Sequence, residues 1–420
     1  MSFTKNMFGC MLGIQCIFGG LRHGSAFMLQ SQYVKQRTFS HLRSNSQVLF
    51  QMSPGVFEAT MGQRVGPLKR EVLSLDTDLN MEVLSQGPVM MPSGGTRRRI
   101  LDREDDDDEK QKSMGLPPLI FVHGSFHGAW CWAEHWMPFF AAMGYPTTAI
   151  SLRGTSGSPL PMVKESNQTK QKGDISSPPS GTVQISEHVE DIKAFLAQRF
   201  PYCVPCESTE KLKNKKDLLP PVLVGHSFGG MTLMKLMEIY PEINLYGAAL
   251  LCSVPPSGNG PMTGRFIRKR FIAAIKIVIG FVFKRATKWP WLARQLFFSP
   301  DIDKKDLKRY VSYFEQDSHV TLDVRQLNSV VPSKSSDENG KSTFLDTAPP
   351  LFVLGAENDY IVDVEGLKET ATFLDVQGEF LRGAYHDVML GPQWKAGAER
   401  VLSWLGRLQK MQEAQIHHIR

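Results

Sequence analysis

Short apolar segments that alternate with helical patterns constrain the fold of this chain more than any other feature. They lie at residues 119–122, 146–152, 221–224 and 245–253, and at the start of the stretches 349–362 and 379–390. Strands in this arrangement pair in parallel, and the helices between them cover both faces of the sheet. The sequence therefore predicts an α/β fold with a mostly parallel, doubly wound sheet, whose reactive groups gather at the carboxyl ends of the strands.

One of these segments is followed by a serine that lies between glycines. In PPVLVGHSFGGM, Ser227 is the central residue of a G-x-S-x-G motif, and a helical pattern begins at Met231. A serine in this motif occupies a strained strand-to-helix turn, where a Cβ at Gly225 or Gly229 would collide with neighbouring backbone. The pentapeptide also occurs in loops without chemistry. The prediction of a nucleophile therefore depends on partners for Ser227.

Two residues beyond later strands can serve as these partners. Asp359 lies four residues past Gly355, and His386 follows a further short strand and a Gly-Ala-Tyr turn. The chain order Ser, Asp, His is the one used by hydrolases with a strand–turn–helix serine. His386 would accept the serine proton and return it to the leaving group, while Asp359 would hold the required tautomer. We therefore predict a catalytic triad of Ser227, Asp359 and His386.

Two other carboxylates lie close to these positions. Glu357 precedes Asp359 by two residues and stays open as an alternative acid. Asp387 directly follows His386. Because adjacent side chains generally point in different directions, Asp387 is expected to point away from the imidazole.

Negative charge that develops on the substrate carbonyl oxygen requires fixed backbone N–H donors. The first donor is expected from Phe228, directly after the nucleophile. The second is expected from the loop after residues 119–122, with Ser125 favoured. This predicted oxyanion loop consists of His123, Gly124, Ser125 and Phe126. His127 and His135, which flank the loop, are predicted to be packing or surface histidines.

Four motifs in a fixed order give the chain a resemblance to a known superfamily. With GHSFGG, HGSFHGAW, GAENDYIV and YHDVML, the chain resembles the α/β-hydrolase superfamily over about residues 117–408. The stretch VHGSFHGAWCW is similar to the plant methylesterase and hydroxynitrile lyase branch. The resemblance implies that Ser227, Asp359 and His386 are nucleophile, acid and base, and that Ser125 and Phe228 are oxyanion donors.

Departures from the family pattern narrow the expected chemistry. The cyanide-releasing lyases of that branch carry Thr in place of Gly124 and Lys in place of Asp387, so lyase chemistry is disfavoured. Ser227 excludes the branches that use an Asp nucleophile, the epoxide hydrolases and haloalkane dehalogenases. We predict a serine esterase that works through an acyl-enzyme, without cofactor or metal. A ligand sensor of the same fold and a non-catalytic scaffold are the alternatives.

The chain divides into six predicted segments. These are a transit peptide at 1–60, an extension with N-terminal strands and an acidic linker at 61–116, the first part of the hydrolase core at 117–254, an inserted helical cap at 255–345, the second part of the core at 346–410 and a tail at 411–420. Residues 1–57 contain no Asp or Glu but five Lys or Arg and seven Ser. This composition favours a chloroplast transit peptide over a mitochondrial one or a secretory signal.

The predicted cap is strongly basic. Residues 255–300 contain nine basic and no acidic residues, which surround the apolar run FIAAIKIVIGFVF at 271–283. This run is too short to span a bilayer. It fits either a buried helix that roofs an apolar pocket or a surface helix whose flanking cations, within 265–288, contact anionic headgroups. Both interpretations predict a small hydrophobic ester or a lipid as substrate.

Two remaining features point to no separate function. The formal net charge is +6, but no nucleic-acid-binding motif accompanies it, so no nucleic-acid partner is expected. Cys203 and Cys206 form a C-x-x-C pair without a second ligand pair at zinc spacing. They are predicted to be loop cysteines without a role, and a regulatory dithiol is the alternative.

Overall fold

The computed structural model describes residues 65–88, 115–161, 181–205, 218–281, 283–317 and 320–419. The predicted transit peptide, the acidic run at 102–110 and Cys206 lie outside the described residues. Within the described part of the chain, no helix combines the length and the apolar character that crossing a membrane requires.

The centre of the structure is an eight-stranded sheet that is parallel except at one edge. Its strands lie in the order β1 (Lys69–Ser74), β2 (Asn80–Gln86), β4 (Thr147–Ile150), β3 (Leu119–Val122), β6 (Val222–His226), β7 (Gly247–Leu251), β9 (Leu351–Ala356) and β10 (Glu379–Leu381). β2 pairs antiparallel with both β1 and β4, and every pairing from β4 to β10 is parallel. The predicted mostly parallel sheet is therefore confirmed.

Helices cover both faces of this sheet, because side chains alternate along each strand. The core helices are α4 (Trp130–Ala133), α5 (Trp136–Ala142), α6 (Ile185–Arg199), α7 (Phe228–Ile239), α13 (Val364–Phe373) and α14 (Trp394–Ile419). Ile120 and Val122 of β3 belong to one core cluster with buried residues of α6, α7 and α13. Phe121, between them, stacks on Trp132 of α4 instead, and Phe352 of β9 stacks on Trp404 of α14. The fold is thus doubly wound, as predicted.

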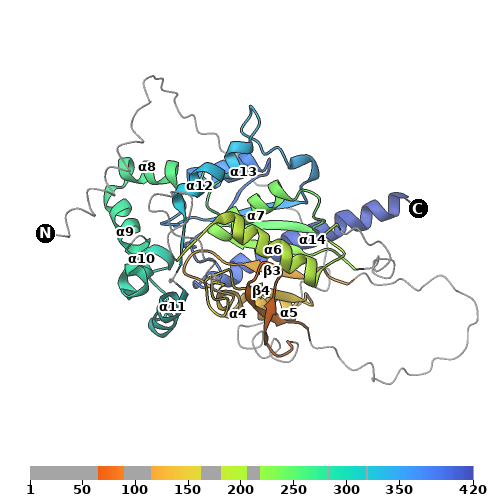
Figure 1. Ribbon diagram of the computed structural model, residues 1–420, viewed down its shortest axis with the longest axis horizontal. Helices are drawn as coiled ribbons and strands as arrows, with labels where there is room; N and C mark the ends of the chain where they lie inside the picture. The colour runs from red at the N-terminus through yellow and green to blue at the C-terminus, as the bar shows by residue number, and fades with distance from the viewer. Residues whose placement is uncertain are drawn as a thin grey trace, which may run out of the picture. The chain divides into compact units, whose positions relative to one another are not determined.

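A helical cap is inserted between β7 and β9. It contains α8 (Asn259–Lys269), α9 (Phe271–Phe281), α10 (Pro290–Phe297), α11 (Lys304–Asp317), α12 (Val324–Val330) and short 3-10 helices at Arg285–Thr287, Pro332–Ser335 and Leu345–Thr347. Helices α8 to α11 lie together on one side of the sheet (Figure 1). Strand β8 (Thr321–Leu322) pairs in parallel with β5 (Thr182–Val183), which precedes α6.

Several polar contacts fasten the cap to the core, among them one at α8 and one at the end of α11. Arg265 of α8 forms an ion pair with Asp363, the N-cap residue of α13, at 2.6 Å. Asp317 at the end of α11 accepts hydrogen bonds from the Trp130 indole N–H and the Ser156 backbone N–H, both at 2.6 Å. Because Asp317 is buried, these bonds are shielded from water, and they hold α11 against the loops at the carboxyl ends of β3 and β4.

Candidate active site

Ser227 occupies a sharp turn between β6, which ends at His226, and α7, which begins at Phe228. Its backbone has φ 53° and ψ −118°, a conformation that non-glycine residues rarely adopt. An added Cβ at Gly225 would lie 2.8 Å from the backbone of Gly229, and one at Gly229 would lie 2.5 Å from the His123 carbonyl oxygen. The glycines of the motif therefore allow the turn to form against the end of β3.

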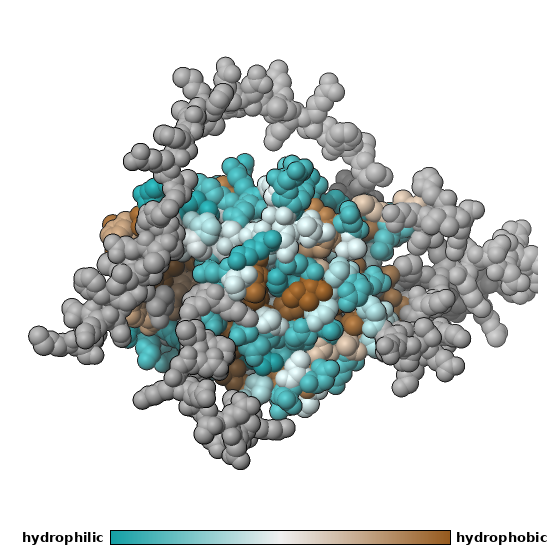
Figure 2. Space-filling view, turned by 45° about the horizontal axis from the view of Figure 1, so that its top comes forward, coloured by the Kyte–Doolittle hydropathy of each residue, from teal (hydrophilic) through white to brown (hydrophobic). Residues whose placement is uncertain are grey.

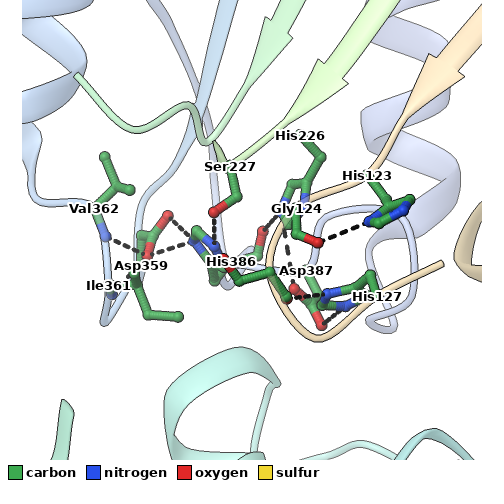
Figure 3. Close-up of polar contacts among 11 residues, drawn as sticks. His123, Gly124, His127, His226, Ser227, Asp359, Ile361, Val362, His386 and Asp387 are labelled. Atoms are coloured by element: carbon green, nitrogen blue, oxygen red, sulfur yellow. Dashed lines mark hydrogen bonds and ion pairs between the residues drawn. The ribbon is translucent and has the colours of Figure 1, made fainter. Parts of the chain in front are cut away.

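The structure brings the three predicted triad residues together. The Ser227 Oγ lies 3.0 Å from His386 Nε2. His386 Nδ1 lies 2.8 Å from Asp359 Oδ2 and 3.0 Å from Oδ1. Figure 3 shows the imidazole between the hydroxyl and the carboxylate. All three residues follow strands whose carboxyl ends meet at one edge of the sheet, which explains their convergence.

The choice among the neighbouring carboxylates is clear from their contacts. Asp359 Oδ1 accepts hydrogen bonds from the backbone N–H groups of Ile361 (2.8 Å) and Val362 (2.9 Å), which fix the carboxylate toward His386. Glu357 instead accepts from the Gly383 N–H. It is Asp359, and not Glu357, that faces the imidazole.

The environment of His386 suits a general base. Burial alone would lower its pKa, but the negative charge and hydrogen bond of Asp359, with a further contribution from the Asp387 charge, raise the pKa above its ordinary value of 6.5. The side chain is nearly inaccessible to solvent. A raised pKa favours acceptance of the Ser227 proton, because the resulting imidazolium is stabilised by the carboxylate at Nδ1.

The predicted oxyanion loop lies directly against the nucleophile. A Cβ added at Gly124 would lie 2.8 Å from Ser227 Cβ and 3.3 Å from its Oγ. The Gly124 carbonyl accepts a hydrogen bond from His123 Nδ1 at 2.8 Å. Because C=O and N–H point in opposite directions across a trans peptide, the Ser125 N–H is directed away from His123. The roles of Ser125 and Phe228 as oxyanion donors stay predictions.

The tautomer of His123 follows from its two backbone partners. Its Nε2 accepts the Leu152 backbone N–H at 2.9 Å, so the ring proton lies on Nδ1, the nitrogen that faces the Gly124 carbonyl. Burial lowers the pKa of His123 to about 3, which keeps the ring neutral. His123 therefore acts as a fixed donor that orients the loop.

Two further buried histidines join the site, and their roles were not apparent from the sequence. His226, the residue before the nucleophile, lies with Nε2 3.0 Å from the His386 carbonyl oxygen. Burial, and next the neighbouring His386 and His127, lower the pKa of His226 well below its usual value. His127 packs against aromatic rings, as predicted, but it also contacts Asp387 at 3.0 Å. The other predicted packing histidine, His135, stacks on Trp394.

Aromatic side chains from the cap close over the imidazole. Phe126 of the predicted oxyanion loop stacks on Phe281, the last residue of α9, with centroids 5.0 Å apart. Phe297 of α10 lies 5.5 Å from Phe281 and 6.1 Å from the His386 ring. Ser227 itself is 8% exposed. The cap therefore places aromatic carbon next to the His386 ring.

Among the residues that the structure describes, two groups of side chains have a geometry that could hold a metal ion. One consists of His226, His386 and Asp387, and the other of Cys252, Asp359 and His386. Both require a ring nitrogen of His386, and both ring nitrogens already have partners in Ser227 and Asp359. A metal would compete with the contacts that join the three triad residues.

Cys203 of the C-x-x-C pair is buried. Burial raises the pKa of its thiol to about 12, so that the reactive thiolate is strongly disfavoured at neutral pH. The predicted alternative of a regulatory dithiol depends also on Cys206, which lies outside the described residues.

The architecture is that of the α/β-hydrolase class. It combines a doubly wound sheet, a serine in a glycine-flanked turn, and a histidine–aspartate pair beyond β9 and β10. A family model described as "Alpha/beta hydrolase family" matches residues 119–398. The chain belongs to this family.

Curated relatives include several plant proteins, in agreement with the predicted branch. Methylesterase 2 of Arabidopsis thaliana is 26% identical over 156 residues, which are 37% of this chain and 46% of that protein. Methylesterase 1 of the same plant is 30% identical over 34% of this chain and 41% of that protein. Salicylic acid-binding protein 2 of Nicotiana tabacum is 29% identical over 33% and 39%. The chain thus spans less than half the length of these curated relatives.

Solved structures share the fold at low sequence identity. An esterase from Exiguobacterium antarcticum matches with a TM-score of 0.51 at 12% identity, over 80% of this chain and 100% of that chain. A laboratory-evolved variant of a potato epoxide hydrolase matches with a TM-score of 0.50 at 15% identity, over 81% and 100%. The shared feature is the fold, since these two proteins carry different names for their activities.

Proposed function

We propose that this chain is a serine hydrolase that cleaves carboxylic esters through an acyl-enzyme. The observation that carries the proposal is the 3.0 Å contact between Ser227 Oγ and His386 Nε2, with Asp359 on the opposite side of the ring. During attack on the ester carbonyl, His386 accepts the Ser227 proton and then donates it to the departing alcohol. His386 then activates a water molecule in the same way. The water attacks the acyl-enzyme, the carboxylic acid departs, and Ser227 regains its proton.

Backbone N–H groups of Phe228 and Ser125 stabilise the tetrahedral oxyanion in this proposal. Phe228 begins α7, so its N–H also benefits from the positive end of the helix dipole. Gly124 supports the second donor, because its missing Cβ lets the predicted oxyanion loop approach Ser227.

The proposed substrate class rests on the aromatic residues beside the imidazole. Phe126, Phe281 and Phe297 pack against one another, and Phe297 lies 6.1 Å from the His386 ring. We therefore propose a small ester with a hydrophobic acyl part, or an acyl lipid. The names of the methylesterase relatives support the ester bond as the target.

Turnover of p-nitrophenyl esters of graded acyl length tests this function. The expected result is steady turnover that is lost in Ser227→Ala, with a preference for acyl chains longer than acetate. A stoichiometric burst without steady turnover would favour a ligand sensor of this fold, and no release of nitrophenol at all would favour a scaffold. Asp191→Asn, a buried carboxylate variant on α6, serves as the matched control.

A second part of the proposal is contact between the cap and an anionic membrane surface. The face shown in Figure 2 is mainly hydrophilic, and its apolar residues form small separate patches. In α9 the small residues Ala273, Ala274 and Gly280 are buried. The large side chains of Phe271 and Ile272 are 61% and 69% exposed. The exposure of these two side chains supports the surface-helix alternative at this end of α9, while Phe281 at its other end packs against Phe126.

Positive charge near the exposed end of α9 supports a lipid partner. Exposed cations that flank α9 in the chain include Arg268, Arg270, Arg285 and Lys288, and Trp289 and Trp291 are exposed nearby in the chain. Large apolar side chains with flanking cations and aromatic residues are typical of helices that lie in the interface of an anionic bilayer.

Flotation with vesicles tests the membrane contact. The chain should float with phosphatidylcholine vesicles that contain phosphatidylglycerol, less well at high salt, and poorly when Phe271 and Ile272 are both changed to Ser. Val72→Ser removes an apolar side chain of similar exposure from β1, and should leave flotation unchanged. Flotation that ignores both salt and the α9 substitutions would overturn the membrane contact.

We also propose that the protein is a chloroplast protein, with the mitochondrion as the alternative. The composition of residues 1–57 supports a transit peptide. A relative from Arabidopsis thaliana, methylesterase 15, carries the word chloroplastic in its name and is 25% identical over 203 residues. A fluorescent fusion of the full chain, compared with one that begins at residue 61, tests the location.

A further inference from the structure

A second buried histidine–carboxylate pair lies beside the predicted triad. His127 Nε2 and Asp387 Oδ2 are 3.0 Å apart, and both side chains are almost fully buried, at 1% and 0% exposure. Asp387 directly follows His386 in the chain, so the loop that carries the imidazole also carries this carboxylate. The pair can be followed below His226 in Figure 3.

The other nitrogen of His127 contacts the predicted oxyanion loop. His127 Nδ1 lies 2.8 Å from the Ser125 carbonyl oxygen. A carbonyl can only accept, so Nδ1 must carry a proton and donate it. With Nε2 toward a carboxylate oxygen, the imidazole is held between two acceptors, and its proton on Nδ1 always faces Ser125.

We infer that Asp387 and His127 form a clamp that orients the Ser125 peptide for oxyanion binding, an inference that rests on the proposed ester hydrolysis. The clamp is complementary to His123, which holds the preceding carbonyl, that of Gly124, at 2.8 Å. Two consecutive carbonyls are thus held by two imidazole N–H donors. The peptide planes on both sides of the Ser125 Cα are fixed, and with them the direction of the Ser125 N–H.

Packing prevents the clamp from rotating. The His127 ring stacks on Trp130 and meets Phe314 of α11 edge-on, with centroid separations of 5.6 and 4.8 Å. The Asp387 backbone N–H donates to the Phe297 carbonyl at the end of α10 at 3.0 Å. His127 and Asp387 are therefore positioning residues, whose effect on the reaction passes through the Ser125 peptide.

Substitutions that keep or remove single hydrogen bonds test the clamp. Asp387→Asn can still bond to His127 Nε2, whereas Asp387→Leu cannot. Likewise, His127→Asn places an amide N–H where Nδ1 lies, whereas His127→Gln reaches toward Asp387 and leaves the Ser125 carbonyl without its donor. We expect kcat on the preferred p-nitrophenyl ester to fall about 10- to 100-fold in Asp387→Leu and His127→Gln, with KM little changed, since misplacement of a reacting group costs up to about 100-fold.

The conservative variants Asp387→Asn and His127→Asn should stay within a few-fold of the wild-type kcat. A trifluoromethyl ketone, which forms a tetrahedral oxyanion adduct with a catalytic serine, gives a second measurement. Its inhibition constant should rise in proportion to the loss of kcat/KM, because both depend on the oxyanion donors. A purely structural role would instead lower the melting temperature without this proportionality. Asp191→Asn, whose described partners are Thr77 and Arg153, controls for loss of a buried carboxylate.

The outcomes separate the clamp from the proposed function. An active wild-type protein with kcat unchanged in Asp387→Leu and His127→Gln overturns the clamp alone. Equal losses in His127→Asn and His127→Gln also overturn it, because the donor to Ser125 would then be irrelevant. A wild-type protein without turnover overturns the proposed ester hydrolysis itself.

Discussion

The two histidine–carboxylate pairs at this site are built from the same groups but differ in what they face. His386 lies 2.8 Å from Asp359 and His127 lies 3.0 Å from Asp387, and both rings are buried. The remaining nitrogen of His386 faces the Ser227 hydroxyl, whereas that of His127 faces a carbonyl. A hydroxyl can give up its proton and a carbonyl cannot, so the first pair can transfer a proton and the second can only hold a bond.

The ring of His226 lies between the two pairs. Its centroid is 4.8 Å from that of His386 and 5.8 Å from that of His127. Its contact with the His386 carbonyl and its low pKa keep it a neutral donor. An uncharged ring thus lies between the pair that we propose for proton transfer and the pair that we propose for positioning.

The largest expected effect comes from removal of the ring that can transfer a proton. His386→Ala should lower kcat roughly 10⁵- to 10⁶-fold, because triad members act as a unit. His127→Ala should cost no more than about 100-fold, as expected for a positioning group. Steady-state hydrolysis of the preferred p-nitrophenyl ester measures both. Losses of equal size would show that the two pairs do not differ in function.

The carboxylates of the two pairs should differ in the same way, so that a substitution of Asp359 lowers kcat more than one of Asp387. Asp359→Asn should lower kcat about 10⁴-fold, because an amide at this position favours the wrong imidazole tautomer. Asp387→Asn should leave kcat within a few-fold, since His127 needs only a bonding partner at Nε2. The same ester assay compares them, with circular dichroism to establish that both variants are folded. A larger loss in Asp387→Asn than in Asp359→Asn would reverse the assignment of the two pairs.

A substitution in the predicted oxyanion loop should have a smaller effect. Gly124 directly precedes Ser125, and a Cβ at Gly124 would lie 2.8 Å from Ser227 Cβ. Gly124→Ala should therefore push the predicted oxyanion loop away and lower kcat about 10²- to 10³-fold, the typical effect of losing one oxyanion donor. Gly260→Ala on α8, where an added Cβ meets nothing within 4 Å, is the matched control. A Gly124→Ala variant as active as this control would show that the predicted oxyanion loop can accommodate a Cβ at this position.

The sequence was sufficient to predict the sheet and the convergence of Ser227, Asp359 and His386. Each of these residues lies within a few positions of the end of a predicted strand, and the carboxyl ends of parallel strands necessarily share one edge of the sheet. The need for Gly225 and Gly229 could also be predicted, because the G-x-S-x-G motif itself implies a turn without room for a Cβ at these positions. Residues that converge because they follow parallel strands can therefore be predicted from the sequence. The catalytic roles of these residues stay predictions.

The clamp and the orientation of α9 could not be predicted in the same way. His127 and Asp387 are 260 positions apart, and each alone resembles an ordinary polar residue in a loop. The run at 271–283 is apolar except for Lys276, so its periodicity could not show which apolar side chains are buried. That choice depends on close packing against α10, where a Cβ at Gly280 would lie 2.4 Å from Leu296 Cδ1.

The smallest expected effect is a shift in the pH dependence of kcat/KM. This shift measures how strongly the charge of the second pair acts on His386 of the first. His386 must be neutral to accept the Ser227 proton, so kcat/KM should fall as the pH drops through its pKa. Burial opposes protonation of His386, but the charges of Asp359 and Asp387 raise its pKa above 6.5, while the neighbouring His226 is neutral. Asp387→Asn removes one of these charges, which lowers the pKa and moves the acidic limb of the profile toward lower pH. The shift is small because Asp387 is also partnered by His127. An acidic limb that moves toward higher pH, or that does not move, would show that the second pair exerts no electrostatic influence on the first.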